Sequence, residues 1–304
     1  MEIVESANNS YRRFEPLGRR VSRLVLGTME VADDVLDEWV RLGGNILDSA
    51  RVYGDGASEE AVGAWFADRP AVRDELVVLT KGAHPEGDVR RVTPAAIAAD
   101  LDASIAALGR PVDVYLLHRD DPALPVGPMI ECLNEHRAAG RLRAFGTSNW
   151  TCERIDEANA FAAAHGLRGF TCNSPQLSLA RQNEEHWPGT MAATDDVRAW
   201  HERTQMPLFA WSAQARGFFA GHDSESAVRV YDNPDNRERR RRASEIAERI
   251  GCTANQVALA WVLAQPYPVF AVIGPRTIEQ LGEAVGALDV SLTGDEVRWL
   301  DLRA

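Results

Sequence analysis

The chain has 304 residues, of which 45% are hydrophobic and 26% are charged, and 33 basic residues against 45 acidic ones give a net charge of −12. This composition is typical of a globular protein with a sizeable core and excludes a disordered or fibrous chain. The negative charge argues against nucleic acid and against an anionic membrane as partners, because both favour a protein with a basic face.

Short apolar runs alternate with longer amphipathic stretches along the chain. Before the first run, residues 11–20 contain Pro16-Leu17-Gly18 between short alternating segments, which predicts a β-hairpin. Eight apolar runs, too short for surface helices, are the candidate strands: residues 24–28, 45–49, 76–81, 112–118, 144–148, 170–174, 208–212 and 269–274. Helical patterns fill the intervals: residues 33–42, 59–66, 94–108, 126–139, 151–165, 195–203, 254–265 and 277–288.

Eight strand-then-helix units predict an α/β fold, the (β/α)8 TIM barrel, whose strands are buried on both faces and form continuous apolar runs. The N-terminal hairpin is expected to cover the barrel floor. A doubly wound sheet is the alternative, but it usually has fewer strands and a glycine-rich first turn, which this chain lacks. Because no linker, repeat or low-complexity segment marks a boundary, we expect residues 1–304 to form a single domain.

Two segments depart from this pattern. Residues 217–236 are rich in glycine, serine and aspartate without clear periodicity, and they directly follow the seventh candidate strand. A long loop at that place would lie on the catalytic rim of a barrel, which predicts a flap over a ligand. The run Arg239 to Arg242 predicts a solvated helix rather than a basic binding site, because four consecutive helical residues point in four directions.

The cysteines and the lack of long apolar stretches favour a cytoplasmic location. Cys132, Cys152, Cys172 and Cys252 lie far apart without paired spacing, which is typical of reduced thiols rather than of a disulfide framework or a zinc site. No apolar stretch reaches the roughly 18 residues of a membrane span, and residues 1–10 are polar and acidic. We therefore expect neither a membrane anchor nor a secretion signal.

Lys81 is the only lysine among the 33 basic residues; the other 32 are arginines. Arginine meets the chain's general need for positive charge, so a lysine retained alone points to chemistry that arginine cannot supply. A lysine offers a compact ammonium with an adjustable pKa. Mutational chance is the alternative explanation.

Lys81 ends the third candidate strand, while Asp48 and His118 stand at the ends of the second and fourth, and Tyr53 follows Asp48 by five residues. The carboxyl ends of barrel strands converge on one face, so we expect these side chains to meet. The ammonium would make the phenol a better acid, the aspartate would keep the lysine charged, and the histidine would orient a substrate oxygen. Taken singly, each has an ordinary alternative: a helix cap, loop packing, a rim charge or a satisfied strand-end histidine.

Five segments in chain order resemble the signatures of the aldo-keto reductase family: LDSARVYG at residues 47–54, LTK at 79–81, YLLH at 115–118, GRLRAFGTSN at 140–149 and IGPRTIEQL at 273–281. The resemblance extends over nearly the whole chain and implies hydride transfer between a nicotinamide cofactor and a carbonyl compound. It further implies that Tyr53 is the general acid in reduction, that Lys81 and Asp48 tune it, and that His118 orients the carbonyl.

The resemblance also implies cofactor contacts: Gly27, Thr28, Met29 and Asp48 beside the nicotinamide, Ser148 and Asn149 at its carboxamide, Trp211 stacked on its ring, Ser212, Gln214 and Gly217 along the pyrophosphate, and Arg276, Gln280 and Glu283 at the adenosine end. Two positions depart from the family pattern. Ala284 stands where the family usually has an asparagine beside the adenine, so one adenine contact is expected to be missing. Ser174 stands where the family usually has a glutamine in the sixth strand. Gln176 lies on the same face of that strand and is expected either to replace this glutamine as a cofactor contact or to contact the substrate.

Gly274 to Thr277 leads from the last candidate strand into a helix, whose N-terminus favours a phosphate, and Arg276 adds a planar donor fork. This combination favours NADPH over NADH, because only NADPH carries a 2′-phosphate. A solvent-facing arginine is the alternative explanation.

We therefore expect an NADPH-dependent reductase with a small-molecule carbonyl substrate and no metal; the sequence leaves the oligomeric state open. Several polar rim residues favour a hydroxylated or sugar-like carbonyl compound. The expected rim residues are Glu30, Arg51, His84, Arg119, Trp150, Trp187, Phe218 and Phe219. Two other functions stay open: a nicotinamide-binding redox-sensing subunit with little turnover, and a Schiff-base aldolase with Lys81 as nucleophile. An aldolase lysine needs a lowered pKa, whereas Asp48 would keep Lys81 charged.

Overall fold

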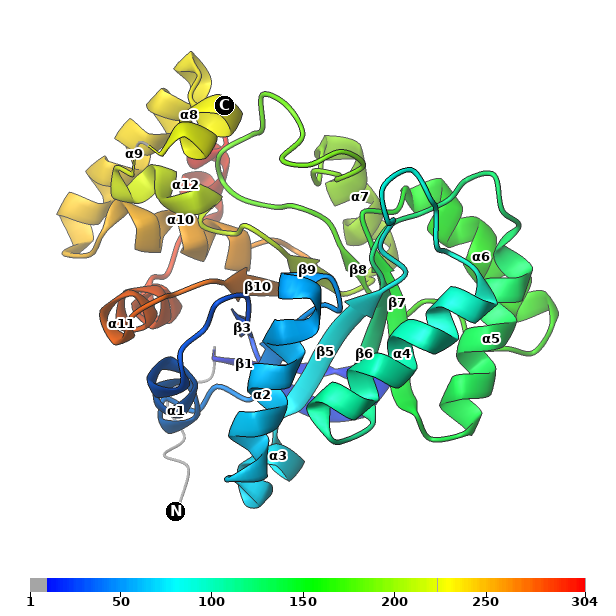
Figure 1. The fold of residues 1–304 in the computed structure, drawn as a ribbon. Helices are drawn as coiled ribbons and strands as arrows, with labels where there is room; N and C mark the ends of the chain where they lie inside the picture. Colours follow the sequence, from blue (N-terminus) through cyan, green and yellow to red (C-terminus); the bar gives the residue numbers. More distant parts are fainter. Residues whose placement is uncertain (1–9, 223, 304) are drawn as a thin grey trace.

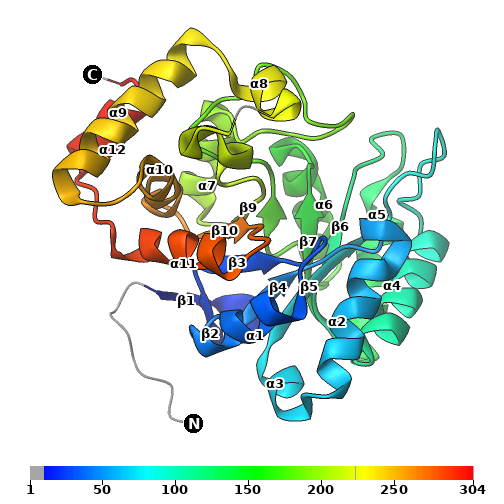
Figure 2. The same ribbon diagram turned by 60° about the vertical axis from the view of Figure 1, so that its left-hand side comes forward.

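The computed structural model describes residues 10–222 and 224–303, and a closed barrel of eight parallel strands occupies its centre (Figures 1 and 2). The barrel strands are β3 (Leu24–Gly27), β4 (Ile46–Asp48), β5 (Val77–Gly82), β6 (Val112–Leu117), β7 (Leu142–Ser148), β8 (Asn173–Ser174), β9 (Leu208–Ala210) and β10 (Val269–Ile273). Neighbouring strands pair in chain order, and β10 pairs with β3 to close the barrel. The predicted (β/α)8 fold is confirmed.

Helices cover the outside of this barrel; in Figure 1, α4, α5 and α6 lie to the right of the strands and α1, α10 and α11 to their left. The helices are α1 (Asp33–Arg41), α2 (Ala57–Ala67), α3 (Pro70–Glu75), α4 (Pro94–Leu108), α5 (Val126–Ala138), α6 (Cys152–Ala164), α7 (Asp195–Thr204), α8 (Glu225–Tyr231), α9 (Pro234–Ile250), α10 (Ala254–Leu263), α11 (Ile278–Gly286) and α12 (Gly294–Leu300). Four short 3-10 helices complete the described elements: η1 (Glu15–Leu17), η2 (Tyr53–Gly56), η3 (Ala215–Ala220) and η4 (Ala287–Asp289).

A hairpin of β1 (Tyr11–Phe14) and β2 (Arg19–Ser22) covers the end of the barrel away from α8 (Figures 1 and 2). The ring of Phe14 is fully buried and lies edge-on to Phe209 and Phe270, with centroids 5.6 and 5.8 Å away. Gly18 ends the connecting turn at φ 66°, a left-handed conformation that glycine adopts without strain. The predicted cover of the barrel floor is confirmed.

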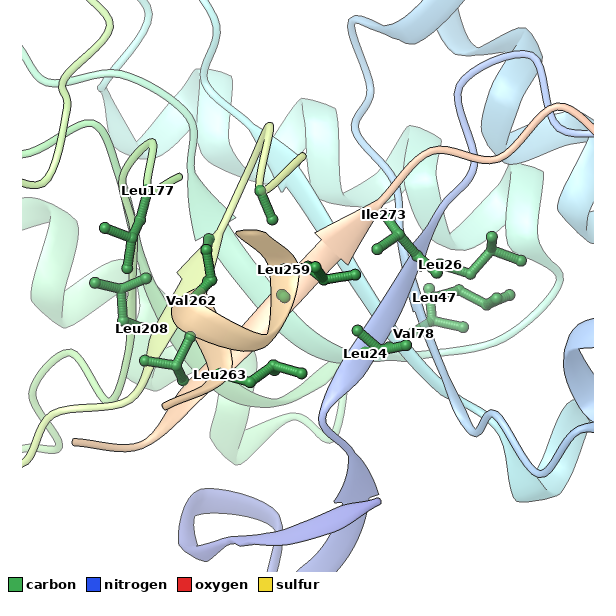
Figure 3. Packing of buried hydrophobic residues seen from close by; sticks show 14 of the residues in the cluster. Leu24, Leu26, Leu47, Val78, Leu177, Leu208, Leu259, Val262, Leu263 and Ile273 are labelled. Atoms are coloured by element: carbon green, nitrogen blue, oxygen red, sulfur yellow. The ribbon is translucent and has the colours of Figure 1, made fainter. Parts of the chain in front are cut away.

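Side chains of each strand point alternately into the barrel and out towards the helices. The inward side chains form one apolar cluster: Val25, Ile46, Val77, Leu79, Val114, Leu116, Ala144, Cys172, Phe209 and Phe270. The outward ones, such as Leu24 and Leu47, pack against the helices, and Figure 3 shows Leu259 and Val262 of α10 among them. Polar residues that continue the inward series beyond this cluster therefore point into the mouth of the barrel.

The sixth barrel strand is shorter than the sequence predicts. The apolar run 170–174 forms only the two-residue β8, although the Thr171 amide and hydroxyl both donate to the carbonyl oxygen of Phe145 in β7 at 2.9 Å. The chain approaches β7 very closely here, because a Cβ on Gly146 would lie 2.3 Å from the carbonyl oxygen of Cys172. Glycine at 146 is what allows this approach.

Residues 217–222 and 224–236 are largely helical, so the prediction of an irregular loop is wrong, but five of these residues line the cavity at the carboxyl ends of the strands, in keeping with the predicted place on the rim. The segment contains most of η3, all of α8 and the start of α9. Ala227, Val230 and Tyr231 bury one face of α8, and the Ser224 hydroxyl caps it by accepting from the Ala227 amide. Two helical turns are too short to show the apolar repeat that sequence reasoning depends on.

The arginine run lies within α9, as the sequence predicts, but it is not solvated throughout. Arg239 is buried, whereas Arg241 and Arg242 pair with Glu238 on the same helix. Within the described residues no helix is long and apolar enough to cross a membrane, and the four cysteines are free thiols. The expected lack of a secretion signal concerns residues 1–10, of which residues 1–9 lie outside the described part.

Candidate active site

A cavity of about 1460 Å³ lies at the carboxyl ends of the barrel strands, lined by segments that follow all eight of them. Three of its polar residues continue the inward series of their strands: Asp48 follows Ile46 by two positions, and Lys81 and His118 likewise follow inward leucines. Strand alternation alone therefore aims these three side chains into the cavity.

The ammonium of Lys81 and the carboxylate of Asp48 form a buried ion pair, with side chains only 3% and 4% exposed. Lys81 Nζ donates to both carboxylate oxygens at 2.8 Å and to the carbonyl oxygen of Ser49 at 2.9 Å. Burial by itself lowers the pKa of Lys81, but Asp48 and then Tyr53 outweigh it and raise that pKa above its usual 10.5. Burial raises the pKa of Asp48, which Lys81 partly offsets. The ammonium is thus held charged.

Tyr53 begins η2, in the loop that follows β4, and its hydroxyl lies 3.4 Å from Lys81 Nζ. Arg51 supports this loop, because its guanidinium donates to the carbonyl oxygen of Asp55 at 2.7 Å and pairs with Glu59. Burial raises the pKa of Tyr53 above its usual 10.0, and Lys81 only partly reverses this. Lys81 lowers this pKa, as the sequence predicts, but burial has the larger effect, so the free protein keeps this proton at neutral pH.

His118 also lies beside Tyr53, with ring centroids 6.1 Å apart, and its ring lies edge-on to His84 with centroids 5.0 Å apart. Its backbone amide donates to the carbonyl oxygen of Gly82 at 2.8 Å, which fixes it beside β5. Burial, followed by the charge of Lys81, puts the pKa of His118 well below its usual 6.5. The imidazole is therefore neutral, with one donor and one acceptor nitrogen, and its buried Nδ1 has no hydrogen-bond partner among the described residues.

Most residues that the sequence assigns to a cofactor line the same cavity: Gly27, Met29, Asp48, Ser148, Asn149, Trp211, Ser212, Gln214, Gly217, Gly274, Arg276, Gln280 and Glu283. Thr28, Ser174 and Gln176 are buried outside its lining. The Thr28 hydroxyl is 2.7 Å from a serine of α2, the Ser174 hydroxyl donates to a carbonyl of β9, and the Gln176 amide donates to the hydroxyl of Tyr231. These three side chains tie secondary-structure elements together.

The Asn149 side chain already makes four hydrogen bonds within the protein. Its Nδ2 donates to the Ser148 hydroxyl at 2.9 Å and to the His118 carbonyl at 3.4 Å. Its Oδ1 accepts from the Met191 amide at 3.0 Å and from the Trp211 indole at 3.3 Å. These contacts use the whole capacity of an amide, so Asn149 here aligns Trp211 with the end of β7.

At the far end of the cavity Arg276 lies in the loop between β10 and α11. Its guanidinium pairs with Glu30 at 2.6 Å, and both side chains are about two-thirds exposed, at 65% and 64%. Its backbone amide donates to Gln280 Oε1 at 2.8 Å, and Thr277 caps α11. An exposed ion pair contributes about 0–1 kcal/mol, so Arg276 can exchange Glu30 for another anion at little cost.

Asn255 is a cavity residue that the sequence analysis missed. It is 4% exposed, its Nδ2 donates to Glu283 Oε2 at 3.3 Å, and its buried Oδ1 has no partner among the described residues. The signal was a polar pair at the start of an otherwise apolar helix, α10. Gln256 of that pair completes the helix cap, whereas Asn255 has no capping role.

The expected rim is only partly present. His84, Arg119 and Trp187 line the cavity, and Trp187 is an exposed aromatic side chain. The other expected rim residues are engaged elsewhere: Glu30 with Arg276, Arg51 with Glu59, and Trp150, Phe218 and Phe219 in the core.

Comparisons with known proteins show which family the chain matches and which solved fold it shares. The model of the Aldo/keto reductase family matches residues 23–302. The chain is 28% identical to the uncharacterized oxidoreductase YrpG of Bacillus subtilis, over 93% of this chain and 92% of the relative. It is also 28% identical to the norsolorinic acid reductase stcV of Emericella nidulans, over 94% and 79%. A crystal structure of the thermostable aldo-keto reductase Tm1743 with the inhibitor epalrestat has the same fold, with a TM-score of 0.76 at 23% identity over 96% of this chain and 98% of that one.

Proposed function

This chain belongs to the aldo/keto reductase family and is an NAD(P)H-dependent oxidoreductase, and on that premise we propose that it reduces an aldehyde or ketone to the alcohol with NADPH. The observation that carries the proposal is the line of three groups in the cavity. The Tyr53 hydroxyl lies 3.4 Å from Lys81 Nζ, which lies 2.8 Å from Asp48. A phenol backed by a buried ammonium is suited to give a proton to a carbonyl oxygen.

The residues present fit a nicotinamide dinucleotide. The cavity runs from Tyr53 at the tetrad (Asp48, Tyr53, Lys81 and His118) to Arg276 and Asn255. The unpartnered Oδ1 of Asn255 supplies a buried acceptor, and an asparagine amide pairs well with the N6 and N7 edge of adenine. We assign Asn255 the adenine contact that the sequence predicts to be missing at Ala284.

A nicotinamide cofactor held by the residues of this cavity would supply the hydride that the carbonyl carbon accepts. Tyr53 gives its proton to the carbonyl oxygen as negative charge develops there, and its raised pKa keeps that proton in place until then. Lys81, held charged by Asp48, stabilises the phenolate that remains. Neutral His118 donates one hydrogen bond to the same oxygen and so fixes the carbonyl group.

Cofactor preference gives a test at the adenosine end. Arg276→Ala is expected to weaken NADPH binding about 10-fold or more and NADH binding far less, because a charge-assisted contact to the 2′-phosphate exists only with NADPH. Fluorescence titration of the free protein with both cofactors measures this. Asn255→Ala is the matched control, since it removes an adenine contact and should weaken both cofactors equally. Equal losses for both cofactors in Arg276→Ala would reverse the preference for NADPH.

The alternative functions have less support. A Schiff-base lysine needs a lowered pKa, whereas Asp48 and Tyr53 raise the pKa of Lys81. A redox-sensing subunit without turnover does not require a phenol within hydrogen-bond distance of a buried ammonium, as Tyr53 and Lys81 are. The aldolase reading predicts a borohydride-stable adduct on Lys81, and its absence with reactive carbonyl compounds would remove that reading.

The direct test is carbonyl-dependent loss of NADPH absorbance, with glyceraldehyde compared with hexanal. The polar groups of the cavity, among them His84 and Arg119, favour the hydroxylated aldehyde, so we expect the higher kcat/KM for glyceraldehyde. Tight NADPH binding without turnover of any carbonyl compound would favour the redox-sensing subunit. A preference for hexanal would overturn the proposed substrate class.

We further propose that the chain acts as one domain in the cytoplasm. Pairing of β3 with β10 joins the two ends of the barrel sequence, which supports one domain. Four free thiols are in keeping with a reducing compartment. The partner on this proposal is a small carbonyl compound.

A further inference from the structure

A buried cation that the proposed proton transfer does not use lies next to the tetrad. Arg119 follows His118 directly, is 8% exposed and lines the cavity. Its guanidinium makes one hydrogen bond to the described residues, from Nη1 to the carbonyl oxygen of His118 at 2.9 Å. No carboxylate among those residues lies within 4.0 Å of it. The other N–H groups of this donor fork are therefore available to a ligand.

The acidic residues near Arg119 are committed to other partners. The carboxylate of Asp120 accepts from Arg154 Nε at 3.2 Å. Glu185 is exposed and its carboxylate accepts from the backbone amide of Gly189 at 2.9 Å. Neither carboxylate therefore forms an ion pair with the Arg119 guanidinium, although the charge of Glu185 acts on it from a greater distance.

Among the buried charged residues that line the cavity, Arg119 alone forms no ion pair with another described residue. Asp48 and Lys81 cancel each other, and burial lowers the pKa values of His118 and His84, so both imidazoles are neutral. Burial also lowers the pKa of Arg119, but a guanidinium remains charged at neutral pH. Its guanidinium is left without a carboxylate in contact, with only the more distant charge of Glu185 acting on it, so a closer anion would stabilise it.

The position of this charge points to the substrate. Arg119 is close enough to the reacting phenol to act on its pKa, and its stem lies against Gly189 at the wall of the cavity. The adenosine end, with Arg276 and Asn255, belongs to the segments around β10 and α10 and not to the loop after β6. An anion at Arg119 would therefore belong to the molecule whose carbonyl faces Tyr53.

We propose that Arg119 binds an anionic group of the substrate, so that the preferred substrates are carbonyl compounds with a carboxylate or phosphate a few atoms from the reacting carbon. A guanidinium presents paired N–H donors that match both groups in a two-point contact. This inference rests on the proposed carbonyl reduction and narrows its substrate class.

Matched pairs of substrates separate charge from shape. The pairs are 4-oxobutanoate with its methyl ester, and glyceraldehyde 3-phosphate with glyceraldehyde. In the pair whose anionic group fits the site, we expect kcat/KM to be about 10- to 100-fold higher for the charged member than for the neutral one. The reason is that only the charged member makes a charge-assisted hydrogen bond to Arg119. The pair that shows the difference identifies carboxylate or phosphate as the ligand. Equal values within both pairs would overturn the inference.

Variants assign the preference to the residue. In Arg119→Gln the ratio of charged to neutral kcat/KM should fall about 10-fold or more, whereas Arg119→Lys, which keeps the charge without the fork, should retain part of it. Arg90→Gln is the matched control, because Arg90 also lines the cavity but is exposed to solvent, where a contact between charges contributes little, whereas Arg119 is 8% exposed. It should keep the wild-type ratio. A ratio unchanged in Arg119→Gln would exclude Arg119 as the anion site.

Fluorescence titration with NADPH distinguishes the substrate from the cofactor as the ligand of Arg119. We expect the affinity for NADPH in Arg119→Gln to remain close to that of the wild type, and a loss as large as in Arg276→Ala would assign the guanidinium to a cofactor phosphate instead. Failure of the proposed function is a separate result, because then no member of either pair would be reduced. Melting temperatures establish that each variant is folded; if Arg119→Gln does not fold, the ratio in Arg119→Lys decides.

Discussion

Replacing Tyr53 by phenylalanine is expected to lower kcat for carbonyl reduction by about 10²–10⁴-fold, the range that a general acid contributes. The substitution removes only the oxygen that lies 3.4 Å from Lys81 Nζ and keeps the ring that faces His118. The carbonyl oxygen of the substrate then loses its proton donor, while the residues expected to bind the cofactor are unchanged. Steady-state kinetics together with NADPH titration measure both effects, and affinity for NADPH should stay close to that of the wild type.

The pH profile and a second tyrosine serve as controls for this prediction. Tyr231→Phe removes a buried hydroxyl that contacts His186 and Gln176 outside the cavity lining, so its kcat should remain near the wild-type value. Burial raises the pKa of Tyr53, so the protonated acid persists as pH rises. The wild-type rate should therefore fall only at pH values above 10.0, the usual pKa of a tyrosine. An unchanged kcat in Tyr53→Phe would refute the assignment of Tyr53 as the acid.

Replacing Lys81 by methionine is expected to cost both activity and stability. It leaves the carboxylate of Asp48 buried without its partner, and breaking a buried ion pair costs about 3–5 kcal/mol. The pKa of Asp48, already raised by burial, should rise further without Lys81. The folded state then binds the Asp48 proton more tightly than the unfolded state, so the contribution of Asp48 to stability is present at low pH and is lost as pH rises through its folded pKa. Urea unfolding at several pH values measures this.

The double variant Asp48→Asn, Lys81→Met separates the structural role of the ion pair from its chemical role. With both charges gone, most of the lost free energy of unfolding should return, because no uncompensated charge is left in the barrel. Activity should stay low, since Tyr53 still lacks an ammonium beside its oxygen. Recovery of reductase activity in this double variant would contradict the proposed role of Lys81.

Regular alternation explains why the centre of the site could be predicted from the sequence. Asp48, Lys81 and His118 each stand at the end of an apolar run, and in a parallel barrel such positions meet on one face. The single lysine among 33 basic residues marked the same place. The direction of the Tyr53 pKa could not be predicted in this way, because it depends on how much burial outweighs the nearby ammonium.

The residues at the periphery of the cavity were harder to predict from the sequence. Strand alternation predicts that Gln176 lies on the same face as Ser174. Its side chain nevertheless turns to Tyr231 of α8, a helix in a segment whose sequence predicts a loop. Asn255 reaches the cavity from α10, and its only signal in the sequence is that it belongs to a polar pair at the start of an apolar helix. Both depend on packing between segments far apart in the chain, which local periodicity does not encode.

Taken alone, the amino-acid sequence determined the barrel, the hairpin over its floor, the family and the residues at its strand ends. These follow from short-range rules: strand alternation, turn residues and the convergence of parallel strands at one end. Only the tertiary structure decided which charges are paired. Asp120 follows Arg119 in the chain, but Arg154 of α6 takes its carboxylate and leaves the guanidinium open to the cavity. Such pairing is set by distances across the fold, and these distances decide whether a buried charge is neutralised or free to bind a ligand.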